Sequence, residues 1–444
     1  MAASTTICLR AVNLSEKHTD YNSVSGDLGG RTQSSQHTFL PLNGESRRPE
    51  APKSNQSVLL LRGTGEKYTL DKDYAIPQLQ HEAEILVQVL AIGLNPIDWK
   101  APAFNFGIPA LPWINGRDLA GRVVRVSDGC SRVQVGDIVL VPSTDYRDIR
   151  KAAFQQYAVA THFNAARIPP TVPVHGGACL GVAFVAAALA LGVSFGLDFT
   201  TAAKSCGPNL PELIASLDSN DIPVDIREEC FSITRDSQQI KPGDWLAIWG
   251  ASTTSGYLTL QLAKLCGLKV ICVADVARHG AKLQKAGADI LIDRYDTNRA
   301  VEIIRGITDG QLLYAMDMVG RESATFLQAA LTTTATTQTH SSGDSSNNNT
   351  IHDRQQAHLL GLTGLPKERE DSSVIRYHTV PIKLFHTANQ VGEKLMVWLE
   401  DLLRTDALIL PEVVQMDGGL DGINEALEHL RNGSVSGKRI VVEI

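Results

Sequence analysis

The chain has 444 residues, of which 43% are hydrophobic and 20% charged, so it can form two folded domains or one large domain with tails. The formal net charge of −7 gives no electrostatic reason to expect a nucleic-acid partner, and no apolar run reaches the roughly 18 residues of a membrane span. The seven cysteines are scattered and include no CxxC pair, which argues against a disulfide framework or a zinc knuckle and favours a reducing, cytoplasmic compartment.

The first part of the ordered chain is predicted to be β-rich. Residues 1–55 are rich in Ser, Thr, Asn, Gly and Pro, and we interpret them as a disordered N-terminal extension. The proline-rich stretch 95–112 is predicted to be a loop over a barrel-like body. Short apolar or alternating runs predict strands at residues 58–61, 67–70, 84–92, 121–126, 136–141 and 154–160.

The middle of the chain changes character. Residues 180–191 are Ala-rich and apolar nearly all round, which suits a helix buried between domains. Residues 200–240 are polar and irregular, and we interpret them as an insertion with one short helix at 210–217. A βαβ unit follows, with a strand at 246–249, a small-residue turn at 250–256, a helix at 257–265 and a strand at 270–274.

The remaining periodicity predicts the rest of an α/β domain and a mixed C-terminal piece. Residues 332–349 are of low complexity and are predicted to be a surface loop. A mixed end after a complete α/β domain suggests that the chain returns to its first domain. The predicted helices lie at 281–285, 300–307, 325–331, 391–403 and 423–431, and the predicted strands at 290–292, 313–319, 359–362, 380–384 and 439–444.

The turn at 250–256 is a degenerate dinucleotide-binding fingerprint. It places a helix N-terminus where a ligand phosphate would bind, but it lacks the full GxGxxG pattern. The hydroxyls of Ser252, Thr253, Thr254 and Ser255 could meet the phosphates in place of the missing glycine amides. From this stretch alone, a βαβ unit that binds no nucleotide stays open as the alternative.

Seven short motifs occur in order along the chain: GLNPIDWK at 93–100, GRDLAG at 116–121, GDIV at 136–139, FQQYAV at 154–159, QLAK at 261–264, GAD at 287–289 and the tail 433–444. Together they resemble the medium-chain dehydrogenase/reductase superfamily, and most of all its zinc-free fungal branch of quinone oxidoreductases and trans-acting enoyl reductases. The resemblance implies an α/β-plus-β fold: a GroES-like β-barrel catalytic domain at 56–190 and a Rossmann-type, doubly wound nucleotide-binding domain at 191–388. Insertions would lie at 200–240 and 332–350, and residues 389–444 would return to the catalytic domain.

The resemblance also implies that both zinc sites of the superfamily are missing. Zinc alcohol dehydrogenases carry a ligand cysteine where this chain has Asn95-Pro96 and a ligand histidine where it has Arg117. Arginine cannot ligate zinc because it is always protonated. Residues 140–153, which replace the cysteine-rich structural zinc lobe, contain no cysteine.

The implied activity is zinc-independent, NADPH-dependent reduction of an activated C=C bond in an enone, an enoyl thioester or a quinone. The protein would act alone on a small molecule, or in trans on an acyl chain carried by a synthase of secondary metabolism. It would be a monomer or a homodimer without a membrane or nucleic-acid partner. An NADH-dependent quinone reductase and a non-catalytic nucleotide-binding protein are the alternatives.

Asn95 and Lys100 are the candidate catalytic residues. The resemblance places them on the loop that lines the cleft, where Asn95 could donate to a substrate or nicotinamide carbonyl and Lys100 to a developing enolate oxygen. The alternatives are an ordinary loop asparagine and a solvated lysine. For Arg117 and Asp118 an internal salt bridge is favoured over catalysis.

The choice between NADPH and NADH depends on the end of the second strand of the βαβ unit. Counting back from Gly287 places the usual acidic position at Ala274, and Arg278 nearby favours a 2′-phosphate and therefore NADPH. Asp275 at the strand end is an acidic residue of the kind that accepts from a ribose 2′-OH, and a helix N-cap is its alternative. The other candidate cofactor contacts are Gly250, Gly361 and Lys438, with a plain hairpin turn as the alternative for Lys438, while His162 and His279 are interpreted as surface histidines.

Overall fold

The structure is a computed structural model that describes residues 54–129, 132–231, 238–331 and 356–444. Every described residue belongs to one compact unit, Pro49–Ile444. The loop predicted at 332–349 and nearly all of the predicted N-terminal extension therefore lie outside the described residues.

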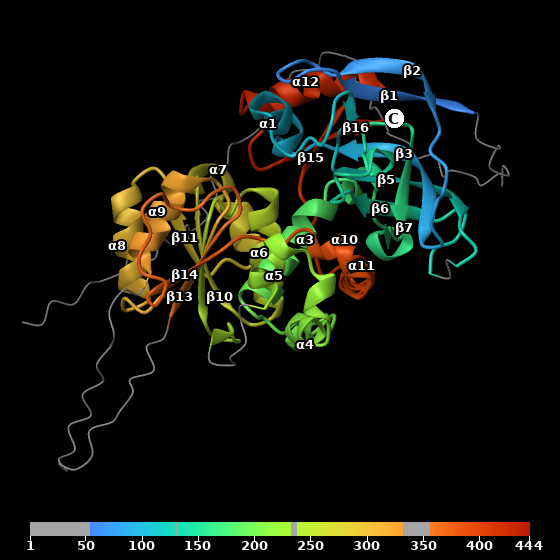
Figure 1. Ribbon diagram of the computed structural model, residues 1–444. Coiled ribbons are helices and arrows are strands. Elements are labelled where there is room, and N and C mark those ends of the chain that lie inside the picture. The colour runs from blue at the N-terminus through green and yellow to red at the C-terminus, as the bar shows by residue number, and fades with distance from the viewer. Residues whose placement is uncertain (1–53, 130–131, 232–237, 332–355) are drawn as a thin grey trace, which may run out of the picture. The chain divides into compact units, whose positions relative to one another are not determined.

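The beginning and the end of the described chain together build two sheets (Figure 1). The smaller has the strand order β2-β1-β4, and the larger has the order β15-β16-β3-β5-β6-β8, with β7 paired to β3. The strands are β1 (Asn55–Leu61), β2 (Thr69–Ala75), β3 (Glu84–Gly93), β4 (Trp113–Ile114), β5 (Asp118–Val126), β6 (Ile138–Pro142), β7 (Tyr157–Thr161), β8 (Ala166–Arg167), β15 (Val413–Met416) and β16 (Arg439–Glu443).

The middle of the chain forms a parallel sheet with the strand order β11-β10-β9-β12-β13-β14. The order reverses between β9 and β12, and ligands of doubly wound sheets bind outside the carboxyl ends of the strands at such a point. The strands are β9 (Trp245–Trp249), β10 (Lys269–Ala274), β11 (Ile290–Asp293), β12 (Tyr314–Asp317), β13 (Ala357–Gly361) and β14 (Ile375–His378).

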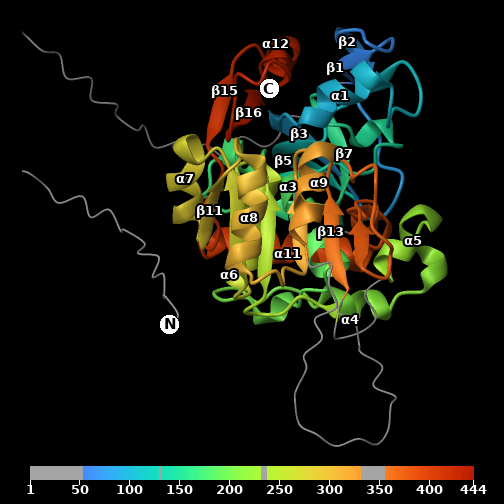
Figure 2. The ribbon, with the colours of Figure 1, turned by 90° about the vertical axis from the view of Figure 1, so that its left-hand side faces the viewer.

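Helices cover both faces of the parallel sheet. In Figures 1 and 2, α8 and α9 lie on one face, and α6 and α7 pack with the core on the other face. The helices are α1 (Pro96–Phe104), α2 (Val174–Gly177), α3 (Gly181–Leu189), α4 (Leu210–Ala215), α5 (Val224–Cys230), α6 (Thr254–Leu265), α7 (Val276–Lys285), α8 (Thr297–Ile307), α9 (Arg321–Ala330), α10 (Leu384–Thr387), α11 (Asn389–Arg404) and α12 (Gly419–Arg431).

The predicted combination of a β-rich part and a doubly wound α/β part is confirmed, but two local predictions are wrong. The proline-rich stretch contains helix α1, because Asn95 caps it and Pro96 occupies the first turn, where a missing N–H costs nothing. The strand predicted at 380–384 is wrong, since the last parallel strand ends at His378 and α10 begins at Leu384. Strand β15 and helix α5 were not predicted.

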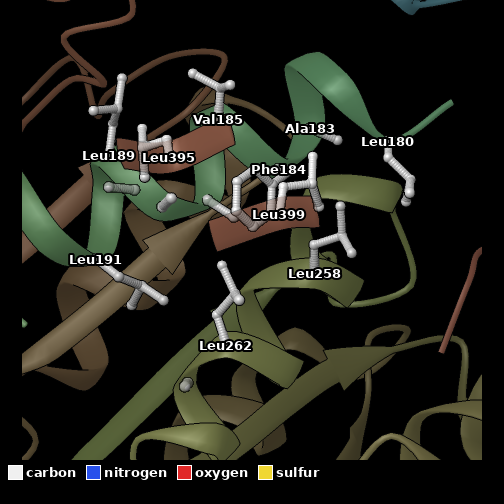
Figure 3. Packing of buried hydrophobic residues seen from close by; sticks show 14 of the residues in the cluster. Leu180, Ala183, Phe184, Val185, Leu189, Leu191, Leu258, Leu262, Leu395 and Leu399 are labelled. Atoms are coloured by element: carbon white, nitrogen blue, oxygen red, sulfur yellow. The ribbon is translucent and has the colours of Figure 1, made fainter. Parts of the chain in front are cut away.

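The buried apolar helix predicted at 180–191 is confirmed as α3, which continues into a π-helical segment, Ala190–Ser194. Its side chains pack against α6 and α11, as Figure 3 shows for Phe184, Leu258 and Leu399. The helical stretch Val174–Ser194 is long and apolar enough to cross a membrane by length and composition, but 94% of its most apolar window is buried in the protein. A core helix of a soluble protein passes the same test.

We expect Leu399→Ala on α11 to lower the free energy of unfolding by about 2–5 kcal/mol, because the fully buried side chain leaves a cavity in this core. Urea unfolding followed by circular dichroism measures the change. Val397→Ala on the same helix is the control: Val397 is 45% exposed, and its truncation should change stability by less than about 0.5 kcal/mol. Equal losses in the two variants would contradict this description of the core.

Candidate active site

The turn between β9 and α6 is held together by its own polar groups. Gly250 has a φ of +82°, which favours glycine. Thr253 is the N-cap of α6: its hydroxyl donates to the Gly250 carbonyl at 2.8 Å and accepts from the Gly256 N–H at 3.1 Å. The Thr253 hydroxyl therefore stabilises the turn as well as facing the helix N-terminus, where Ser252, Thr254 and Ser255 are half-buried.

Gly256 allows the turn to lie close to the helix. A Cβ atom at this position would lie 2.6 Å from the Gly250 carbonyl oxygen and 2.9 Å from the Ala251 Cα. Close packing of helix and strand is the role of the third glycine in a dinucleotide-binding fingerprint. The altered motif therefore keeps the glycines that shape the backbone.

Asp317, which the sequence analysis missed, lies at the carboxyl end of β12. It pairs in register with Trp249 on one side and with Gly361 on the other, so it lies at the point where the strand order reverses. Its Oδ1 accepts from the N–H groups of Val319 and Gly320 at 3.0 and 2.7 Å, while its Oδ2 has no hydrogen-bond partner in the described part of the chain. Burial raises the pKa of Asp317 to about 6. An acidic residue ending an apolar strand is the sequence signal that could have revealed it.

The end of β10 carries the groups predicted to select the cofactor. Asp275 is the N-cap of α7, which was the alternative considered for it, and it accepts from the Arg278 N–H at 3.1 Å. The Tyr295 hydroxyl donates to the other carboxylate oxygen at 3.1 Å. The Arg278 side chain is exposed, and the backbone N–H of Arg294 donates to the Ala274 carbonyl at 3.0 Å, so a second arginine, not predicted, lies at this edge.

The C-terminal turn before β16 contacts α7. Ser436 shares a hydrogen bond of 3.0 Å with His279, and the Lys282 ammonium donates to the Gly437 carbonyl at 2.6 Å. Lys438 forms an ion pair with Glu412 at 3.0 Å and is half-exposed. The interpretation of His279 as a surface histidine is wrong, because only 7% of it is exposed.

Asn95 lies in a buried cluster of polar side chains. Its amide donates to Asp118 Oδ2 at 2.9 Å, and its Oδ1 accepts from Arg439 at 3.1 Å. Arg439 also forms an ion pair with Asp118 at 3.2 Å, and all three side chains are buried. The predicted salt bridge of Asp118 is therefore present, but its partner is Arg439, which is 321 residues away, rather than the neighbouring Arg117.

Helix α1 continues this buried cluster. Asp98 accepts from the Asn95 N–H at 2.8 Å, and burial raises the pKa of its carboxyl group to about 7. Arg117 is buried, with its guanidinium 5.5 Å from the centre of the Tyr146 ring. Lys100 is half-buried on α1, with its ammonium 5.7 Å from the centre of the Trp99 ring, so it lies on a helix and not on a loop.

These donors do not suit zinc. The positions at which the resemblance implies missing ligands carry an amide and a guanidinium, and zinc is bound by thiolate, imidazole or carboxylate groups. Within the four described ranges, no group of three or more His, Cys, Asp or Glu side chains is placed to share a metal ion.

Comparisons with known proteins agree with this architecture. Residues 81–178 match the alcohol dehydrogenase GroES-like domain, and residues 256–360 match the zinc-binding dehydrogenase family. The chain is similar to trans-enoyl reductase mycC of Thermothelomyces thermophilus, with 26% identity over 418 residues, covering 87% of this chain and 96% of that protein. It is also similar to the enoyl reductase component lovC of the lovastatin nonaketide synthase of Aspergillus terreus, with 25% identity over 418 residues, covering 89% of this chain and 98% of that protein.

The chain belongs to the medium-chain dehydrogenase/reductase superfamily. The predicted fold, with a GroES-like part and a Rossmann-type part, is confirmed, and the chain is an oxidoreductase of this superfamily. Among solved structures its fold is similar to that of a mycobacterial protein complexed with NADPH, with a TM-score of 0.60 and 18% identity, covering 88% of this chain and 100% of that chain.

A nicotinamide cofactor fits the parallel sheet of this superfamily member. The N-terminus of α6 and the turn before it lie at the carboxyl end of β9, next to the reversal of the strand order, where a dinucleotide pyrophosphate binds. The unpartnered Oδ2 of Asp317 lies at the carboxyl end of the neighbouring strand.

We expect the stability of Asp317→Asn relative to the wild type to rise with pH. A buried carboxyl group whose folded-state pKa is raised to about 6 stabilises the fold only while protonated, so its contribution is lost as pH rises from about 4 to 7. The asparagine keeps an Oδ1 for the two N–H groups and carries no charge, so it should gain up to about 3 kcal/mol over the wild type between pH 4 and pH 8. Urea unfolding at both pH values measures this, and a pH-independent difference would contradict it.

Proposed function

We propose that this protein is a zinc-independent, NADPH-dependent reductase of activated C=C bonds in enones, enoyl thioesters or quinones. One observation carries the proposal: a dinucleotide-binding turn at the reversal of a doubly wound sheet is joined, in one chain, to a catalytic part with Asn95 and Arg117 at the metal-ligand positions. When bound, the nicotinamide supplies the hydride, and this chain supplies binding, orientation and hydrogen bonds.

The cofactor would be held by residues of the parallel sheet and the C-terminal turn. The turn at 250–256 would bind the pyrophosphate through its backbone N–H groups and the hydroxyls of Ser252, Thr254 and Ser255, with Thr253 holding the turn in shape. Arg278, with Arg294 beside it, would bind the 2′-phosphate. Gly361 would contact the nicotinamide through its backbone, and Lys438 would approach a phosphate.

On the catalytic side, Lys100 would donate a hydrogen bond to the oxygen on which negative charge develops. Both ends of the Asn95 amide already bind protein groups, so its contacts favour a positioning role at the start of α1 over direct donation to substrate. We propose domain boundaries at 56–190, 191–388 and 389–444, with residues 1–55 as an extension.

The similarity to proteins named trans-enoyl reductases supports action in trans on a carrier-bound acyl chain of secondary metabolism. We propose that this action takes place in the cytoplasm, because the scattered cysteines suit a reducing compartment. Purified protein with NADPH, assayed on a small enone, an enoyl thioester of coenzyme A and a quinone, tests the reductase. Thioester turnover without quinone turnover favours the acyl substrate, and the reverse favours the quinone reductase alternative. NADPH-induced thermal stabilisation without turnover of any of the three would favour a non-catalytic nucleotide-binding protein.

We expect Arg278→Ala to weaken NADPH binding roughly tenfold and to leave NADH binding unchanged, because only NADPH carries the 2′-phosphate that the guanidinium would bind. Isothermal titration with both cofactors measures the two affinities. Arg305→Ala, which removes an exposed arginine of α8, is the control and should change neither. A full preference for NADPH in Arg278→Ala would remove this residue from the phosphate site.

We expect Lys100→Met to lower kcat by about 10²–10³-fold with little change in NADPH affinity, because the lost donor acts on charge that develops only in the transition state. Steady-state rates of NADPH oxidation with the best substrate give kcat and KM. The matched control, Lys394→Met, removes an exposed lysine of helix α11 and should keep wild-type rates. Equal kcat values in the two variants would show that Lys100 has no catalytic role.

A further inference from the structure

The buried cluster around Asn95 joins three distant parts of the chain. Arg439 begins β16, Asn95 caps α1 and Asp118 begins β5, and each of these side chains contacts the other two. Only 7% of the Arg439 side chain and 1% of the Asp118 side chain are exposed. The second oxygen of Asp118 accepts from the Val182 N–H in the first turn of α3 at 2.7 Å, so the cluster also holds the central core helix.

Both terminal nitrogens of Arg439 donate hydrogen bonds, while its buried Nε has no partner in the described part of the chain. One terminal nitrogen donates to Asn95 and the other donates to Asp118, at 3.1 and 3.2 Å. A lysine ammonium is a single point charge and lacks this planar fork. Arg439 therefore fixes the distance and the direction between the start of α1 and the start of β5.

This buried ion pair is poorly explained by stability alone. Replacing a buried pair with apolar side chains is often neutral or stabilising, whereas directed hydrogen bonds from the two terminal nitrogens favour one geometry. The residues that follow Arg439 on the strand, Ile440 to Val442, are apolar and buried, so an apolar side chain would suit this position. The charged pair instead places Asn95 and Asp118 in one defined geometry relative to Arg439.

That placement is transmitted to α1. The Asn95 N–H donates to Asp98, and the Asp98 backbone carbonyl accepts from the Tyr68 hydroxyl at 2.7 Å. Hydrogen bonds at Asn95 and at the Asp98 carbonyl therefore hold the first turn of α1, and Lys100 lies on the next turn. A shift of Asn95 would move the backbone that carries Lys100.

We propose that Arg439 is a positioning residue: by bridging Asn95 and Asp118 it fixes α1, and with it Lys100, in the geometry that the reduction requires. This inference rests on the proposed function of Lys100. Displacements of about 1 Å from a productive geometry can cost on the order of 10²-fold in rate.

The test compares Arg439→Met and Arg439→Lys with Arg404→Met, which removes a 69%-exposed arginine of α11. We expect Arg439→Met to lower kcat about 10²-fold with unchanged NADPH affinity, Arg439→Lys to recover part of the loss, and Arg404→Met to match the wild type. Since Arg439 acts through Lys100, the substitution should cost little further rate in a Lys100→Met background. The same fold-loss in both backgrounds would overturn the proposal, because it would show a role independent of Lys100.

Hydrogen exchange provides a readout that does not need activity. Arg439→Lys keeps the positive charge but can no longer donate to both Asn95 and Asp118 from a planar group. We expect it to raise the exchange rates of the α1 amides and to leave those of the α8 amides unchanged. The same variant provides the test if Arg439→Met does not fold. Unchanged exchange in α1 would overturn the positioning role. If the wild type reduces none of the substrates, the proposed function fails, but faster exchange in α1 would still show that Arg439 fixes this helix.

Discussion

The burial of α3 is the constraint on which the rest of the structure depends. The helix and its π-helical continuation are apolar on all sides, so they are stable only where other elements cover them completely. The core around them contains Ala120 of β5 and Leu140 of β6, Ile248 of β9, and residues of α6 and α11. Because one helix needs all these partners, the sheet built from the chain ends and the parallel sheet share this core, although each sheet also has a separate core on its other face.

Asp118 brings a buried charge against this apolar core. Asp118 accepts a hydrogen bond from the first turn of α3, and its burial is tolerated because Arg439 and Asn95 also bind it. Burial raises the pKa of Asp118, and the neighbouring guanidinium opposes that shift. The guanidinium of Arg439 thus joins β16, the start of α1 and the start of β5 by hydrogen bonds from its two terminal nitrogens, while its buried Nε has no hydrogen-bond partner in the described part of the chain.

The turn before α6, where the cofactor would bind, depends on backbone shape more than on charge. Gly250 and Gly256 let the turn approach α6 closely, and the Thr253 hydroxyl secures the turn from within. The altered fingerprint therefore carries an internal cap: the Thr253 hydroxyl accepts from the Gly256 N–H at the N-terminus of α6, where an anion would bind. Asp317 adds a buried acid beside this turn, so the electrostatics of the site depend on its protonation.

By itself, the sequence determined the elements with clear periodicity, the strand–turn–helix at 245–265 and the lack of cysteine and histidine at the positions discussed for zinc. These features are local, so spacing along the chain suffices to predict them. Only the tertiary structure decided that Asn95 starts a helix, that Asp118 pairs with Arg439 and that Asp317 lies beside Gly361. Such contacts depend on which distant segments the shared core brings together. The spacing of residues along the chain does not show which segments become neighbours in space.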